Sequence, residues 1–487
     1  MRRRGRGARP RGARVLFGMV LCVGCMVGPA AASAAEVGGV APASAAEVAG
    51  DAVTSAAEVA IRGRAVADSV PGPRLTLQSV YADVEGPPVL LERTDGLEVD
   101  HGWNVFATVG DRFQVHDRIS ASYRVRAGRS ARGNRLDVRE LMAHLRLGSW
   151  TLSAGRGTRR LGRGERGRLL LDDNAAAFDM VELRTREPVR LPGFMASWGE
   201  FGFDVLNGVL PFADEMPHDP RYVTAGKPVA RPNLLAMRMT YAPTDWLEVG
   251  MTRTALYGGV GRERYDTFGE WWDLLTARNE NRSTGDGRGG DQMAAVDLEV
   301  SVPWLEGVGP IDEVRGWVEY AGTDIHAGWQ GDDTHSWFPF VLTDVAVLSG
   351  GSVRMGSTTL TVEHVRVHPD WYRHSGYPQG YSNDRIGMGH PVGSDAARMT
   401  SGLLWNDSDE MSVSCWVAWD RRLEASRFAA SPSAWRVLVE RTLPHPSGDW
   451  RAGLLIDHDD APSSTGMGAT SEGTAFGISL STSMANH

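Results

Sequence analysis

From Pro73 onward, apolar and polar residues alternate along the chain with a period of two, which is the pattern of half-buried β-strands. In one clear segment, Val318 and Tyr320 alternate with Trp317 and Glu319. On each such strand one face can meet lipid or core and the other can meet water. The pattern therefore predicts an all-β chain.

The alternation and its interruptions predict about 18 strands, and an even number would bring both ends of a barrel to the same side. An even count between about 16 and 20 is the broader expectation. The expected ranges are 73–84, 97–109, 112–127, 136–147, 149–156, 177–185, 200–210, 234–242, 245–257, 292–302, 312–321, 336–348, 355–367, 397–405, 411–420, 433–442, 449–458 and 474–483.

The connections between these strands alternate between short and long. Tight turns are expected at Gly110-Asp111 and Gly148-Ser149, and the 349–354 connection is also short, whereas 258–291 and 368–396 are long. Short turns on one side and long loops on the other are typical of a bacterial outer-membrane barrel. We therefore expect residues 73–487 to form a transmembrane antiparallel β-barrel, whose closure would pair every backbone polar group within the bilayer.

Six tryptophans lie near the expected strand ends, where barrels carry aromatic girdles at the membrane interface. The alternative is that these rings are buried in the core of a soluble protein. They are Trp246, Trp304, Trp337, Trp405, Trp435 and Trp450.

The amino terminus has the three parts of an export signal. Seven arginines are followed by the apolar run Val15–Val27 and by the small residues Ala32-Ser33-Ala34, which predicts a signal peptide over residues 1–35. A lipoprotein anchor at Cys25 is the weaker alternative, because Cys22 stands where leucine is preferred. Residues 36–72 are rich in Ala, Val, Glu and Gly and are expected to be a low-complexity periplasmic lead.

Composition narrows the function classes. The net charge of −9 argues against a nucleic-acid partner, because phosphate contacts need a basic face. The chain has no G-x-S-x-G elbow, no H-E-x-x-H motif and no P-loop, so we expect neither enzymatic activity nor a cofactor. His364 and His368 would lie about 13 Å apart on one strand face, at about 3.3 Å per residue, so they are expected to be exposed histidines that bind no metal.

The first candidate site is an arginine-rich stretch between two expected strands. If it turns into the barrel or lines the mouth, it could bind an anionic sugar or constrict a pore. The alternative is a solvated charged loop. Its arginines are Arg156, Arg159, Arg160, Arg163, Arg166 and Arg168, of which the first four are our candidate glycan-binding residues.

The second candidate site is the long connection 368–396, which holds four aromatic residues among prolines and glycines. Planar rings on a surface loop can stack on sugar rings. Alternatively, the rings pack the loop together. The residues are Trp371, Tyr372, Tyr377 and Tyr381.

An ordered series of short motifs spans residues 135–405 and resembles the Wzi-type capsule-assembly outer-membrane proteins. Each motif alone is weak, but their order and spacing together are specific. Where that family often has Trp-Trp-Gly-Pro-Gly, this chain has Arg160–Gly164. The motifs are Leu152–Arg156, Leu169–Ala175, Trp246–Ala255 with Gly258-Gly259, Trp272–Leu275 with Asn279, Asp291–Ala294 with Asp297, and Gly387–Pro391 with Gly393.

The resemblance implies an 18-stranded, lectin-like barrel with no catalytic residue. Such a protein would bind exported capsular or extracellular polysaccharide at the cell surface and help to assemble or anchor the capsule, with outer-membrane lipid and the export machinery as further partners. Trp271–Leu275 is expected to form a short helix in a long loop that plugs or caps the barrel. The alternative function is a porin or sugar-conducting channel, suggested by the strand number and the arginines.

Overall fold

A computed structural model describes residues 73–83, 96–97, 99–130, 133–217, 222–262, 265–275, 290–327, 340–406, 412–422, 433–443, 450–459 and 473–483. The predicted signal peptide and low-complexity lead lie outside these residues and remain predictions. No helix in the described part of the chain is both long enough and apolar enough to cross a membrane.

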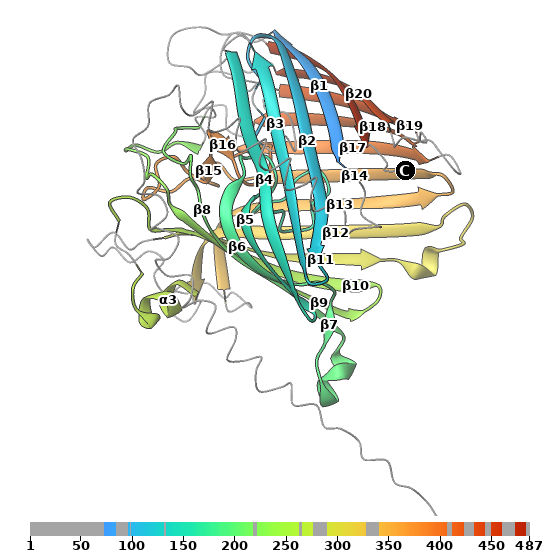
Figure 1. Cartoon of the computed structure of the whole chain (residues 1–487). Coiled ribbons are helices and arrows are strands. Elements are labelled where there is room, and N and C mark those ends of the chain that lie inside the picture. Colours follow the sequence, from blue (N-terminus) through green and yellow to red (C-terminus); the bar gives the residue numbers. More distant parts are fainter. Residues whose placement is uncertain are drawn as a thin grey trace, which may run out of the picture.

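The described residues form one antiparallel sheet of eighteen long strands plus the two-residue strand β7 (Val189–Arg190). Each long strand pairs with its neighbours in chain order, and β1 pairs with both β2 and β21, so the last strand returns to the first (Figure 1). The long strands are β1 (Arg74–Asp83), β2 (Gly102–His116), β3 (Ile119–Ser130), β4 (Gly133–Leu147), β5 (Trp150–Gly157), β6 (Phe178–Thr185), β8 (Glu200–Val209), β9 (Asn233–Thr244), β10 (Leu247–Tyr257), β11 (Asp291–Ser301), β12 (Glu313–Ala327), β13 (Phe340–Met355), β14 (Thr358–Val367), β17 (Ala396–Asn406), β18 (Ser412–Arg422), β19 (Ser433–Leu443), β20 (Trp450–Asp459) and β21 (Gly473–Ser483).

The prediction of an all-β antiparallel barrel with 18 strands is confirmed, but two turns were misplaced. Gly110 lies within β2, opposite Arg124 of β3, and the turn follows His116. Likewise, 349–354 belongs to β13, whose turn to β14 comes after Met355. In both cases a glycine was taken for a chain reversal, although strands also contain glycine where backbones or rings approach closely.

The alternation places large apolar side chains along the outside of the barrel and the buried charged side chains of the strands on the inside. This reverses the arrangement of a soluble protein and is typical of a barrel that faces lipid. Large exposed side chains on the outer face include Met251, Val296, Val318, Tyr320, Leu360, Val362, Met399, Leu403, Val417 and Trp419. Buried charged side chains on the inner face include Glu182, Asp297, Glu319, Glu363 and Arg398.

Of the four predicted girdle tryptophans whose side chains are described, three are exposed near strand ends and Trp405 is half-buried. Trp246 and Trp304 are exposed and form an edge-to-face pair 6.1 Å apart on the short-turn side of the barrel. Trp435 is exposed near the start of β19, on the long-loop side. Trp337 and the side chain of Trp450 lie outside the described part.

Short elements decorate the ends of the barrel. The 3-10 helices η3 (Gly193–Trp198) and η5 (Pro303–Leu305) lie in connections on the short-turn side, and β15 (Ser382–Asn383) pairs with β16 (Ile386–Gly387) in a separate small sheet. The predicted short helix exists as α3 (Phe268–Leu275). It does not plug the barrel, however, because it packs on the outer face of β10 (Figure 1).

The largest buried cluster combines inward-facing strand residues with residues of long connections. Leu206, Leu256 and Leu348 from strands pack in the same cluster as Leu170 and Tyr372 from loops. The hydrophobic core therefore lies inside the barrel, where inward-facing strand residues pack against loops that fold back into it.

Candidate functional site

The arginine-rich connection between β5 and β6, residues 158–177, enters the barrel, and we call it the luminal loop. Arg159 donates to both carboxylate oxygens of Glu182 on β6, one of them at 2.6 Å. The Arg166 guanidinium lies 4.5 Å from the ring centre of Trp416 on β18. These two strands are nine places apart in the eighteen-strand ring, so this stretch of the loop crosses the lumen from one wall to the opposite wall.

Arg163 is the most heavily paired residue of the luminal loop. Its guanidinium contacts Glu248 and donates to Asp297 at 3.2 Å and to Glu299 at 2.8 Å. Its backbone N–H donates to Glu319 Oε2 at 3.1 Å. These carboxylates come from β10, β11 and β12, so one arginine ties the loop to three adjacent strands.

A second anchor uses the backbone of the loop and not its side chains. The N–H groups of Glu165 and Arg166 donate to the two carboxylate oxygens of Glu363, at 2.7 and 3.2 Å. The Trp317 indole N–H donates to the same carboxylate at 3.0 Å. A buried carboxylate that accepts three hydrogen bonds is well compensated, so this contact fixes the loop without another arginine.

The luminal loop also closes on itself. Arg160 donates to Asp172 at 2.7 Å, and the Arg168 N–H donates to the other oxygen at 2.8 Å. Burial raises the pKa of Asp172 above its ordinary value; Arg160 opposes this effect and Asp173 adds to it. Of the two alternatives that the sequence left open for this stretch, the structure has the one in which it turns into the barrel and not the solvated loop, and sugar binding by its arginines stays a prediction.

The second candidate loop is buried, so its four rings form no exposed stacking surface. Trp371, Tyr372, Tyr377 and Tyr381 are each 0–1% exposed. Tyr372 stacks between Tyr381, at 6.0 Å, and Tyr222 from the connection 210–232, at 5.5 Å. The expectation that these rings meet a sugar at the surface is corrected, because other loops cover them; the alternative, that they pack the loop, matches their burial.

Hydrogen bonds join the second candidate loop to the luminal loop. The Tyr372 hydroxyl donates to Leu169 O at 2.6 Å and accepts from the His390 N–H at 2.7 Å. The Asn174 side chain donates to Gly389 O at 2.6 Å, and the Asp172 N–H donates to Met388 O at 2.7 Å. The two predicted sites are therefore brought together as one folded body.

Arg156 stands apart from the other candidate arginines. It is the next-to-last residue of β5 and, by alternation from the inward-facing Ser153, faces away from the lumen at the rim. It forms a two-pronged ion pair with Asp179, at 2.8 and 2.9 Å, and lies 5.8 Å from the ring centre of the exposed Phe212. We call Arg156, Asp179 and Phe212 the rim cluster.

Sequence reasoning missed the partners of the predicted residues. Alternation along the strands could have shown that the acidic residues bonded to the luminal loop face inward. Nothing in the sequence, however, indicated which loop they would bind. Tyr222 carried no signal at all. The missed acidic residues are Glu182, Glu248, Asp297, Glu299, Glu319 and Glu363.

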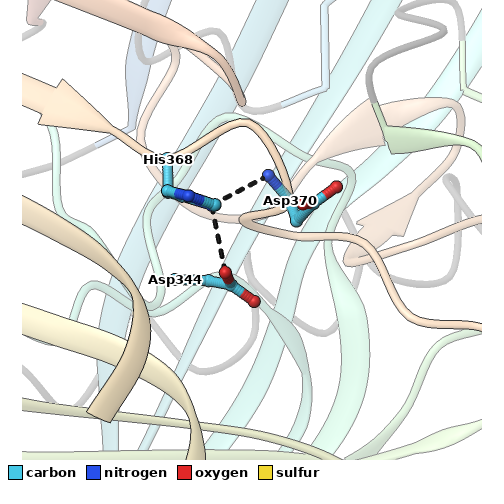
Figure 2. A group of neighbouring side chains, drawn as sticks. All are labelled: Asp344, His368 and Asp370. Atoms are coloured by element: carbon cyan, nitrogen blue, oxygen red, sulfur yellow. Dashed lines mark hydrogen bonds and ion pairs between the residues drawn. The ribbon is translucent and has the colours of Figure 1, made fainter.

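One group of three side chains among the described residues has a geometry that could hold a metal ion. The donor atoms of Asp344, His368 and Asp370 lie within 4.8 Å of one another (Figure 2), and His368 Nδ1 is 3.1 Å from Asp344 Oδ1. One imidazole and two carboxylates suit a divalent transition ion. Arg373 already pairs with Asp370 at 3.1 Å, so an arginine supplies part of the positive charge there. The sequence did not indicate this group, because Asp344 lies on β13, the strand paired with the one that precedes His368.

Comparison with known proteins places this architecture. The solved structure of Wzi from Escherichia coli, an outer-membrane protein involved in group 1 capsule assembly and a carbohydrate-binding β-barrel, is 14% identical, with a TM-score of 0.60 and 86% of each chain covered. OpdK of Pseudomonas aeruginosa is 12% identical, with a TM-score of 0.47, 84% of this chain and 97% of that one covered. No curated protein matches the sequence significantly. The family model described as capsule assembly protein Wzi matches residues 82–417, and the chain belongs to the Wzi family of capsule assembly proteins.

Proposed function

We propose that this protein lies in the bacterial outer membrane, binds capsular or extracellular polysaccharide at the cell surface, and helps to assemble or anchor the capsule. Membership in the Wzi family across residues 82–417 carries this proposal. The carbohydrate binding of the similar E. coli barrel supports it. The proposed role is binding without catalysis, with the long loops outside the cell, as barrels of this type place them.

The rim cluster is the proposed point of contact with the polymer. Of the four candidate arginines, Arg156 is the most exposed, at 28% of its side chain, against 17–21% for the three that are paired inside the barrel. A guanidinium held in a fork by Asp179 and set over the Phe212 ring offers hydrogen-bond donors beside an apolar face, which is a combination suited to a sugar ring.

A conducting channel is the alternative function, and the luminal loop argues against it. A pore needs an open path, whereas this loop crosses the lumen and is bonded to opposite walls. Planar-bilayer recordings would test the channel, which predicts steady conductance from the unmodified protein.

The decisive experiment deletes the gene and measures polymer in the cell and medium fractions. Anchoring predicts unchanged total polymer with a shift to the medium, whereas polymer that stays on the cell would refute the role. Purified barrel should bind the polymer, and Arg156→Gln should weaken binding about 10- to 150-fold, since one hydrogen-bonded charge contributes about 1.5–3 kcal/mol. Arg190→Gln is the matched control, because Arg190 pairs with Glu200 on the short-turn side.

A further inference from the structure

We propose that α3 is an interfacial anchor, with Phe268 and Trp272 inserted in the outer lipid leaflet beside the barrel wall. The sequence prediction placed this helix inside or above the barrel. Instead, the helix packs on the outer face of β10. In a membrane-embedded barrel, a helix at this place would lie next to lipid. This inference goes beyond polysaccharide binding and rests only on the proposed membrane location.

The helix is fixed at both ends. At its start, Thr267 Oγ1 accepts from the Glu270 N–H at 3.3 Å, and Glu270 Oε2 accepts from the Thr267 N–H at 2.9 Å, which is a capping box. At its end, the Arg253 guanidinium donates to the carbonyls of Leu274 and Leu275. An eight-residue helix is too short to be stable alone; the capping box stabilises its first turn, and Arg253 ties its end to the wall.

The faces of α3 divide its apolar side chains between the wall and the surroundings. Leu274 is buried against Ala255 and Tyr257, with Trp271 packed beside them. Phe268 and Trp272, one helical turn apart, stack 6.2 Å from each other and remain 55% and 45% exposed. A large aromatic pair exposed on a helix that already has a buried face indicates a second apolar neighbour.

The level of the helix on the wall identifies that neighbour as lipid. Arg253, which holds the end of α3, lies two residues along β10 from Met251 on the same face, a step of about 7 Å. Met251 is 47% exposed, and its partners on the adjacent strands, Met239 and Val296, are exposed as well. The exposed apolar residues Met251, Met239 and Val296 on the outside of the barrel therefore reach the C-terminal end of α3. This is the level at which aromatic rings lie between hydrocarbon and water.

The test places the photoreactive residue benzoylphenylalanine at Phe268 in the full chain expressed in cells, with the same residue at Met251 and Val260 in separate variants. Val260 is an exposed apolar residue of the same connection, beyond the end of β10. After irradiation, mass spectrometry identifies the adducts. We expect adducts carrying fatty acyl chains at Phe268 and Met251 and none at Val260.

Each other outcome overturns a defined part of the reasoning. Lipid adducts at Met251 but glycan, protein or no adducts at Phe268 would refute the anchor and leave the membrane location intact. No lipid adduct at Met251 would refute the location itself. As a second measurement, Phe268→Glu with Trp272→Glu should lower the folded fraction in membranes several-fold, whereas Val260→Glu should leave it unchanged; equal effects would also refute the anchor.

Discussion

Replacing Arg163 by methionine tests whether ion pairs hold the luminal loop in place. Methionine keeps most of the side-chain volume and removes the charge that faces Glu248, Asp297 and Glu299. Breaking a buried ion pair from one side costs about 3–5 kcal/mol when the remaining charge is left unpaired. Here Asp297 keeps Arg238, which donates to both its oxygens at 2.6 and 2.9 Å.

Glu299 likewise keeps Arg315, so the cost should fall at or below the lower end of that range, about 2–3 kcal/mol. Urea unfolding in lipid vesicles, followed by tryptophan fluorescence, measures the change in the free energy of unfolding. Arg190→Ala is the control, because both partners of its ion pair are exposed and such pairs contribute about 0–1 kcal/mol. If Arg163→Met and the control unfold alike, the network does not hold the loop.

Three further changes probe the loops. Gly162→Ala should lower the free energy of unfolding by about 1–3 kcal/mol more than Gly133→Ala in the same urea assay. Both glycines have φ near +130°, but only a Cβ at Gly162 would lie 2.7 Å from the Glu319 carboxylate. Equal losses would mean that the backbone angle alone causes the effect. Tyr372→Phe keeps the ring stack and removes the hydroxyl that bonds both loops, so protease cleavage within the luminal loop should become faster, and an unchanged rate would contradict that link. Since burial raises the pKa of Asp172, its protonation stabilises the fold fully below its ordinary pKa of about 4, and this contribution is lost as pH rises through the raised value. Asp172→Asn should remove that part of the pH dependence of the urea midpoint, and an unchanged pH profile would count against the assignment.

The barrel could be predicted from the sequence because alternation is a local signal. Val318 and Glu319 point to opposite faces whatever the rest of the chain does. The errors fell at Gly110 and at 349–354, where the strand continues through glycine. Helix α3 was also predicted, but its place was not, because an apolar helix face does not reveal which apolar surface it meets.

The candidate site was predictable only in part. The arginines between two strands left open whether the loop enters the lumen or stays in solvent, and the pairing of Arg163 with Asp297 joins residues far apart in the sequence. The burial of Tyr372 depends on Tyr222 and Leu169, which arrive from two other connections. Contacts of this kind are set by which loops meet after the barrel closes, and no periodic pattern reports them.

The crossing of the lumen by the luminal loop has a mechanical consequence. A polymer attached to the cell surface pulls on the protein that retains it, and a hollow cylinder gripped at one loop would deform at that point. Here the outer connection 368–395 is bonded to the luminal loop through Tyr372 and Asn174, and that loop is bonded to opposite walls. If the protein retains polymer as proposed, the luminal loop would act as a cross-brace that divides the tension among strands on both sides of the barrel.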